Sequence, residues 1–415
     1  MQSLSIMKSN RTKLVMASLC GLLTVVRFAS AQHWIQTTAP TKEFWRAVAS
    51  SADGSAMVAA GLGGIYRSTN SGATWTPTSA PAGLSWFSIA SSADGSTLAA
   101  GVAGGRIYIS TNGGVTWKSS DAPSNSWQCV ACSADGIRQV AVYGEPFSTG
   151  GVFTSTNAGA NWIASAVPTN RFGWYAVASS ADGAKLAAMM VDVLTPAGPY
   201  GWIYISTNAG ATWEQSWSMA WPCHLACSAD GTKLVAAKGE FGPLSGWIIT
   251  STNSGATWVR ATTPAGTWTS AACSADGTRL VAAIGGYSNN PISGPVYTST
   301  DSGTSWAMEG SPTNDWAAVA SSADGGLLVA AVNGGGIYVR QTTIAPVINI
   351  YPVGTNLLLS WLVPSSSFVL QENSDLTSTN WTDVPTPSVL NFTTLNYQVT
   401  VAPTNSQCFY RLRQQ

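Results

Sequence analysis

Short apolar segments recur along residues 32–343, and turns rich in Gly, Asn, Asp and Ser separate them. In the first unit the segments are WRAVASS, AMVAAG, IYRST and TWTPTSAP, which place β-branched and aromatic residues between the turns. Alternation of this kind, broken by residues that accept positive φ, is typical of short antiparallel strands. The pattern therefore predicts four strands in each unit.

Two markers set the length of the unit. The octapeptide STNSGATW and its variants occur six times, and Ser-Ala-Asp-Gly occurs seven times at spacings of 41 to 48 residues. A period in the forties with four short strands is typical of a propeller blade. We therefore expect an all-β fold, a seven-bladed β-propeller over residues 32–343. The octapeptides end at Trp75, Trp117, Trp162, Trp213, Trp258 and Trp306.

The two ends of the repeat region differ from its middle. After the seventh Ser-Ala-Asp-Gly the chain reads GGGIYVRQTT, a third strand without an octapeptide or a fourth strand. Residues 33–40, HWIQTTAP, match the fourth strand TWTPTSAP of the first unit. The N-terminal segment should therefore supply the outer strand of the last blade, which removes an open sheet edge.

The octapeptide resembles the Asp-box, Ser-x-Asp-x-Gly-x-Thr-Trp, of sialidases, sortilin-type receptors, xyloglucan-degrading glycosidases and photosystem II assembly factor-like proteins (the BNR repeat). The resemblance implies a hairpin between the third and fourth strands, away from the functional face. Five of the six boxes carry Asn, and only Asp301 keeps the acid. Asn retains the carbonyl acceptor that a turn needs but not a carboxylate, so the boxes are expected to be structural, neither catalytic nor metal-binding.

Residues 344–415 have a different pattern. Segments such as TNLLLSWLV, SFVLQENS and NYQVTVAP read as short strands of a small β-sandwich, with Trp361 and Trp381 as core candidates. This region is similar to the Ig-like or fibronectin-like modules appended to exported bacterial proteins.

Residues 1–31 have the form of a secretory signal peptide. A basic start with Lys8, Arg11 and Lys13 precedes the apolar run LVMASLCGLLTVV and the small residues Ala29-Ser30-Ala31. The run is shorter than the ~20 residues that a spanning helix needs. We expect a secreted, periplasmic or cell-surface protein with no membrane insertion after signal cleavage, and a monomer.

The charge composition limits the partners. Lys+Arg and Asp+Glu both number 19, so the formal net charge is zero. No basic field is present to hold nucleic acid, and none of the motifs implies a cofactor.

A sialidase-like site is the obvious enzymatic comparison. That resemblance implies an Arg-Ile-Pro signature, which the chain lacks. A glycosidase needs two carboxylates ~5–10 Å apart. Three acids fall in unusually long loops between second and third strands, on one arc of the ring, where loop elaboration indicates a ligand surface. These three acids, Glu145, Asp192 and Glu240, are ligand contacts, a catalytic pair or solvated loop residues. Tyr287, in a further long loop, is a fourth candidate for ligand contact.

A Trp stands eight residues before the Asp of each Ser-Ala-Asp-Gly, with one at nine. In a propeller these residues would enter the innermost strands near the mouth of the central channel. They could bind a glycan or a peptide, or they could pack between blades, since duplication copies core residues too. The set is Trp45, Trp86, Trp127, Trp174, Trp221, Trp268 and Trp316.

Six cysteines remain after the signal peptide: 129, 132, 223, 227, 273 and 408. Cys132, Cys227 and Cys273 replace a Ser of the other repeats, which indicates small buried side chains, while a disulfide between Cys227 and Cys273 stays open. With only His33 and His224 in the mature chain, no metal site and no His-dependent triad is expected.

These observations predict an exported, non-catalytic binding protein whose propeller face opposite the Asp-boxes recognises a glycan or an extracellular protein. The alternatives are a sialidase-like glycoside hydrolase, and a structural or assembly factor of the cell envelope.

Overall fold

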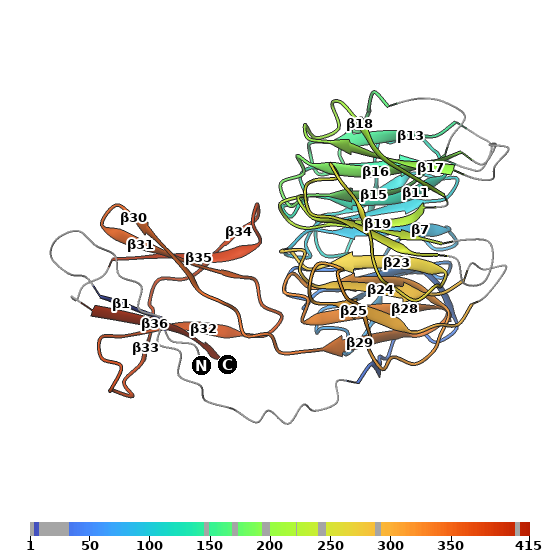
Figure 1. Ribbon diagram of the computed structural model, residues 1–415. Coiled ribbons are helices and arrows are strands. Elements are labelled where there is room, and N and C mark those ends of the chain that lie inside the picture. The colour runs from blue at the N-terminus through green and yellow to red at the C-terminus, as the bar shows by residue number, and fades with distance from the viewer. Residues whose placement is uncertain are drawn as a thin grey trace.

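The computed structural model describes residues 4–7, 33–144, 149–167, 173–192, 200–220, 222–239, 246–286, 292–402 and 407–415. All regular secondary structure in these ranges is β-strand. Helices of the length and apolarity needed to cross a membrane are absent from the same ranges. The prediction of an all-β fold is therefore confirmed, and Figure 1 shows a large propeller beside a smaller pair of sheets.

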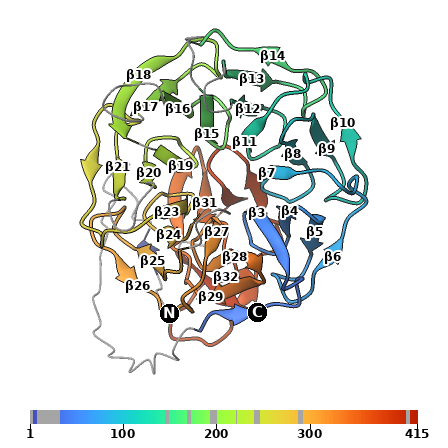
Figure 2. The ribbon, with the colours of Figure 1, turned by 90° about the vertical axis from the view of Figure 1, so that its right-hand side faces the viewer.

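The propeller strands group into antiparallel units of four strands, called blades here and numbered in chain order; the first and last blades are joined into one sheet by pairing of β28 (Leu327–Gly335) with β3 (Glu43–Ser50). The inner strand of each blade contacts the inner strand of the next, and that of blade seven contacts that of blade one. Figure 2 shows the blades arranged around one axis. Blade one has β3 (Glu43–Ser50), β4 (Met57–Gly61), β5 (Gly64–Ser68) and β6 (Thr76–Pro77); blade two has β7 (Trp86–Ser91), β8 (Leu98–Val102), β9 (Ile107–Ser110) and β10 (Lys118–Ser119); blade three has β11 (Trp127–Cys132), β12 (Gln139–Tyr143), β13 (Gly151–Ser155) and β14 (Ile163–Ala164); blade four has β15 (Gly173–Ser179), β16 (Leu186–Asp192), β17 (Tyr200–Ser206) and β18 (Glu214–Ala220).

Blade seven is built from both ends of the propeller region. Its outer strand β2 (Ile35–Gln36) pairs with β29, with Ile35 opposite Val339 and Gln36 opposite Tyr338. The predicted closure by the N-terminal strand is confirmed. The remaining strands are β19 (Pro222–Cys227), β20 (Leu234–Lys238), β21 (Ile248–Ser251) and β22 (Val259–Arg260) in blade five; β23 (Trp268–Cys273), β24 (Leu280–Ile284), β25 (Val296–Ser299) and β26 (Ala307–Met308) in blade six; and β27 (Trp316–Ser321), β28 (Leu327–Gly335) and β29 (Ile337–Gln341) in blade seven.

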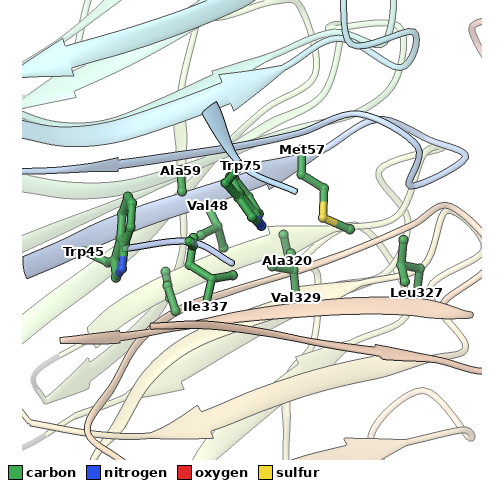
Figure 3. Close-up of a cluster of buried hydrophobic side chains, with 12 residues drawn as sticks. Trp45, Val48, Met57, Ala59, Trp75, Ala320, Leu327, Val329 and Ile337 are labelled. Carbon is green, nitrogen blue, oxygen red and sulfur yellow. The ribbon is translucent and has the colours of Figure 1, made fainter. Parts of the chain in front are cut away.

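The joint between blades one and seven has its own apolar core. Figure 3 shows Trp45, Val48 and Met57 of blade one against side chains of blade seven. Val329 and Ile337 from blade seven are almost fully buried in this cluster. Burial at this joint removes apolar surface from water, so the contact between the first and last repeats stabilises the closed ring.

A circle of main-chain hydrogen bonds closes the propeller where the inner strands end. The alanine of each Ser-Ala-Asp-Gly donates its N–H to the carbonyl of the next such alanine at 2.7 Å, and Ala323 donates to Ala52. Such a circle requires one turn of the same geometry per blade. We call it the alanine ring; its members are Ala52, Ala93, Ala134, Ala181, Ala229, Ala275 and Ala323.

The Asp-box forms the turn between third and fourth strands, as the resemblance implied. In the first box Asn70 Oδ1 accepts hydrogen bonds from the Thr74 N–H at 2.9 Å and from the Ser68 hydroxyl at 2.9 Å. Ser71 and Gly72 both have positive φ, 56° and 83°. The box thus needs two consecutive left-handed residues, of which the second is always Gly because it accepts this conformation without strain.

Residues beyond the propeller form two small sheets with Leu359, Trp361 and Leu370 buried in a common cluster. Trp361 is a core residue, as predicted, whereas Trp381 is half-buried and carries the Arg411 guanidinium 4.3 Å from its ring centre. One sheet has the order β30 (Asn349–Val353), β31 (Asn356–Leu362), β35 (Asn396–Val401) and β34 (Val389–Asn391), and the other has β1 (Leu4–Met7), β36 (Gln407–Gln414), β32 (Phe368–Asn373) and β33 (Thr382–Asp383).

Strand β1 lies within the segment predicted to be a signal peptide. It pairs with β36 from Leu4 opposite Tyr410 to Met7 opposite Gln407. The cleavage of residues 1–31 stays a prediction. Cleavage would remove this strand and leave β36 at the edge of its sheet.

The small sandwich contacts the propeller at the alanine ring. Leu395, in the turn between β34 and β35, packs on ring alanines and has a positive φ of 52°. Ser365 donates its N–H and its hydroxyl to Asp324 Oδ2, at 2.7 and 2.9 Å. The sandwich therefore covers the end of the propeller axis where the inner strands finish.

Candidate functional site

The tryptophans that begin the inner strands are buried. Trp45, Trp86, Trp127, Trp174, Trp268 and Trp316 are each 0% exposed. They pack against aromatic rings of their own blade, most of them edge-on, as in Trp86–Tyr108 at 5.1 Å and Trp316–Tyr338 at 5.4 Å. The expectation that these six contact a ligand is wrong, because their rings fill the space between blades; Trp221 lies outside the described residues.

Of the loop candidates, only Asp192 falls within the described residues. Asp192 is the last residue of β16, opposite Tyr200. Glu145, Glu240 and Tyr287 lie outside the described residues. Their assignment to a ligand surface stays a prediction.

A β-bulge follows the repeated tryptophan. The pairing register of every inner strand with its second strand shifts by one residue at this place, as between Trp45 and Ala47. Bulges re-aim side chains and recur beside functional sites. The bulged residues are Arg46, Phe87, Gln128, Tyr175, Cys223, Thr269 and Ala317.

These residues form a partly exposed ring around the propeller axis, at the end away from the sandwich. Arg46, Phe87, Gln128, Tyr175, Thr269 and Ala317 are all half-buried, whereas the tryptophan before each is fully buried. We call these six described residues the bulge ring. The inner strands that carry them surround the centre of the propeller (Figure 2). The sequence analysis did not identify this set. One signal was available, because the Trp recurs in every repeat whereas the residue after it varies.

Members of the bulge ring contact one another, their own blade or the next blade. The Arg46 guanidinium lies 5.6 Å from the centre of the Phe87 ring. Gln128 Nε2 donates to the Gly144 carbonyl at 2.9 Å. Thr269 Oγ1 donates to the Trp316 carbonyl at 2.7 Å, which joins blade six to blade seven. The ring is thus held in place by contacts within and between blades.

Arg46 and Asp315 provide the charge of the ring. Burial lowers the pKa of Arg46, and the negative charge of Asp315 opposes that shift, so the guanidinium stays protonated. Asp315 is 9% exposed and accepts hydrogen bonds from the Gly286 N–H and from Asn333 Nδ2. This carboxylate is therefore anchored by its neighbours, and its negative charge favours the protonated form of Arg46.

The described acids near the bulge ring do not form a pair arranged for hydrolysis. Glu43 Oε1 accepts the Gly63 N–H at 2.5 Å, and both oxygens of Asp315 accept hydrogen bonds. Groups of three or more His, Cys, Asp or Glu that could hold a metal ion are absent from the described part of the chain. The bulge ring offers a cation, two aromatic rings, an amide and a hydroxyl.

The cysteines that replace Ser in the repeats are free thiols. Cys227 and Cys273, the pair for which a disulfide had been left open, are both unbonded. Burial raises the pKa of Cys132 and of Cys227 to about 12. These thiols are small core groups and not nucleophiles.

The comparisons with known proteins agree with this architecture. The family model described as BNR/Asp-box repeat matches residues 108–119, the second octapeptide with its flanking strands. Curated protein sequences give no significant match. The repeat identifies the turn, and it spans too little of the chain to assign the whole protein to a family.

Solved structures show the same fold. "YCF48 bound to D1 peptide" is 15% identical with a TM-score of 0.55, covering 76% of this chain and 97% of that one. The GH74 xyloglucanase from Xanthomonas campestris is 16% identical with a TM-score of 0.53, covering 80% of this chain and 59% of that one. The Kuenenia stuttgartiensis hydrazine synthase is 14% identical with a TM-score of 0.55, covering 78% and 99%. At these identities the likeness concerns the β-propeller fold alone.

Proposed function

We propose that the chain is an exported, non-catalytic binding protein that holds a segment of a partner protein at the bulge ring. The observation that carries the proposal is the variation at the bulged position. Six described blades present six different side chains there, whereas the flanking Trp and the Ser-Ala-Asp-Gly turn repeat. A scaffold position that is kept in geometry and varied in chemistry suits recognition of one specific partner.

A protein segment fits this ring better than a glycan does. Sugar faces stack on exposed aromatic rings, and the six described tryptophans are fully buried. Arg46 beside Phe87 and the amide of Gln128 suit main-chain carbonyls and mixed side chains. One propeller of similar fold, YCF48, has been solved with a peptide bound, which supports a peptide ligand by analogy.

The hydrolase alternative has less support in the described residues. Glu43 and Asp315 are each held by main-chain N–H groups, and Asp315 faces Arg46. A general acid needs a free path to the leaving group. Neither acid is arranged for that role, which supports binding without catalysis.

The test is selection of a displayed random peptide library on the secreted chain. We expect enriched peptides whose binding is lost in the double variant Phe87→Ala/Gln128→Ala and kept in Ile163→Ser, a change of an exposed outer-strand residue. A glycan array and an assay for released reducing sugar run in parallel. Sugar release would overturn the non-catalytic proposal, and glycan binding that the double variant abolishes would replace the peptide with a glycan.

A further inference from the structure

A groove repeats between adjacent blades on the Asp-box side of the propeller. Its walls come from the Ser-Ala-Asp-Gly turns and from the ends of the third strands. Its cavity volume is about 10 Å³ between blades three and four and about 0 Å³ between blades five and six. Between blades one and two the volume is about 300 Å³. The same scaffold therefore leaves some junctions open, the one between blades one and two among them, and closes others.

The side chain two residues after each Ser-Ala-Asp-Gly closes the groove at the junctions that follow blades three and five, whereas Arg279 at this position in blade six leaves a groove of about 200 Å³. Arg138 and Lys233 occupy this position in blades three and five, and they reach the Asp182 and Asp276 carbonyls of the next blade at 2.7 and 2.9 Å. In blade one the position is Ala56, whose Cβ faces Gly95 of blade two as the longer side chains face their glycines. A methyl group cannot fill the space that a long basic side chain fills elsewhere.

The open groove carries one cation and one anion. Arg67 and Asp94 both line it, with Met57 and Leu98 as apolar wall residues. Arg67 Nη1 donates to the Gly113 carbonyl at 3.0 Å, which fixes the guanidinium and leaves further N–H donors. Arg67 is itself peculiar to this blade, since Ile109 and Thr154 stand at the equivalent place in blades two and three.

Asp94 is prepared for a cationic group. Ser92 and Ser96 hold Asp94 Oδ1 at 2.6 and 2.9 Å, and Oδ2 accepts the Ser96 hydroxyl at 2.9 Å. Burial acts to raise the pKa of this carboxyl, but these hydrogen bonds outweigh it and lower the pKa. Among the described residues no ion pair joins Arg67 to Asp94. The two opposite charges thus line one cavity without neutralising each other directly.

We propose that this groove binds a small zwitterion of the amino-acid class, with its carboxylate on Arg67 and its ammonium group on Asp94. A volume of about 300 Å³ is at the small end of ligand pockets, which suits a single amino acid. Between blades six and seven a groove of about 200 Å³ also contains arginines, but there Arg340 is paired with Glu309 at 2.6 Å. The junction of blades one and two is therefore the better zwitterion site.

The repeats supply variants that should fold. Ala56→Lys places in blade one the residue that Lys185 and Lys233 already provide at the equivalent position, and it should fill the groove. Arg67→Ile copies Ile109 and Ile205 and removes the cation. Ile163→Ser serves as a distant control.

The experiment measures binding of each standard L-amino acid to the full secreted chain by saturation-transfer NMR, followed by calorimetric titration of the positives. Acetate and ethylammonium are the single-charge controls. We expect at least one amino acid to bind, Ala56→Lys to abolish its binding, and Arg67→Ile to weaken it at least about tenfold, since a charge-assisted contact is lost. Binding should persist in Ile163→Ser and in Phe87→Ala/Gln128→Ala, which separates this site from the bulge ring.

Three outcomes would overturn the proposal: no signal from any amino acid, acetate binding as tightly as the amino acid, or unchanged binding in Ala56→Lys. Circular dichroism and thermal unfolding of each variant show whether a lost signal comes from the groove or from misfolding. If a variant misfolds, competition between the bound amino acid and acetate on the wild-type chain decides the point, because a zwitterion site binds the single charge more weakly.

Discussion

The backbone N–H of Ala323 donates a 2.7 Å hydrogen bond to the carbonyl of Ala52 and so joins the last repeat to the first. The same bond links each of the other ring alanines to its successor. Together with β2 on β29, it closes the propeller at two radii, near the axis and at the rim. Closure of this kind leaves no free sheet edge between the first and last blades.

Leu395 should control the docking of the small sandwich on the propeller. Leu395→Ala removes a half-buried side chain that contacts the alanine ring and should weaken docking by about 1–3 kcal/mol. We expect faster limited proteolysis of the segment 342–348, which connects the two parts. Phe392→Ala, a nearby exposed change, should leave the cleavage rate unaltered. Equal rates in wild type and Leu395→Ala would contradict a docking role.

His224 should make the fold sensitive to mild acid. Its Nδ1 accepts the Ala271 N–H from the next blade, and desolvation lowers its pKa from 6.5 to about 4. The unfolded chain therefore takes up a proton before the folded chain does, so stability falls as the pH drops from 6.5 to about 4 and is unaffected above 6.5. The loss from this group is at most about 3 kcal/mol.

His224→Gln keeps an acceptor and removes the titration. We expect urea unfolding across this pH window to show that the free energy of unfolding falls further towards acid in the wild type than in the variant. Several aspartates also titrate towards acid, and both proteins share that contribution. Parallel pH profiles for the two proteins would rule out this role for His224.

The Asp-box should tolerate an aspartate in place of its asparagine but not truncation of that side chain. Asn112 Oδ1 accepts the Thr116 N–H at 2.9 Å, and its Nδ2 donates to the Thr116 hydroxyl at 2.9 Å. Asp301 makes the equivalent contacts, with the Ser305 hydroxyl as the donor. Asn112→Asp should therefore change the free energy of unfolding little at neutral pH, whereas Asn112→Ala should lower it by about 1–2 kcal/mol. Equal losses in the two variants would show that the amide donor matters and the acceptor does not.

The repeat cysteines should resist thiol reagents in the folded protein. The pKa of Cys132 and of Cys227 is raised to about 12 by burial, with nearby aspartates adding to the shift, so the thiolate is scarce at neutral pH. Labelling with iodoacetamide, read peptide by peptide by mass spectrometry, should be slow until denaturant is added. Rapid labelling of either residue in the native protein would contradict this prediction.

Much of the architecture could be predicted from local chemistry. The turns of Ser-Ala-Asp-Gly and of the octapeptide depend on residues within a few positions, as in Asn70 with Thr74, so the sequence shows them directly. The count of turns then predicted the blades, and the missing fourth strand predicted that β2 completes blade seven. The exchange of Ser for Cys likewise indicated buried small residues, and Cys132 and Cys227 are half-buried free thiols packed against the core clusters.

The candidate site escaped prediction because a β-bulge separates neighbours. The repeated Trp was a candidate either for ligand contact or for packing between blades; it is buried between blades, and the bulge presents the following residue instead. A shift of one residue exchanges the two faces of a strand, and the hydrophobic pattern does not encode where it occurs. The contrast between Trp45 and Arg46 is the example: 0% exposed for the first and half-buried beside Asp315 for the second.

The sequence by itself determined the turns, the repeat and the closing strand, because each depends on contacts within a few residues or on a simple count. Only the tertiary structure decided which side chains surround the axis, that Leu395 meets the alanine ring, and that Ala56 leaves a groove open beside Arg67 and Asp94. These features join residues that are far apart in the chain, and packing between blades sets them.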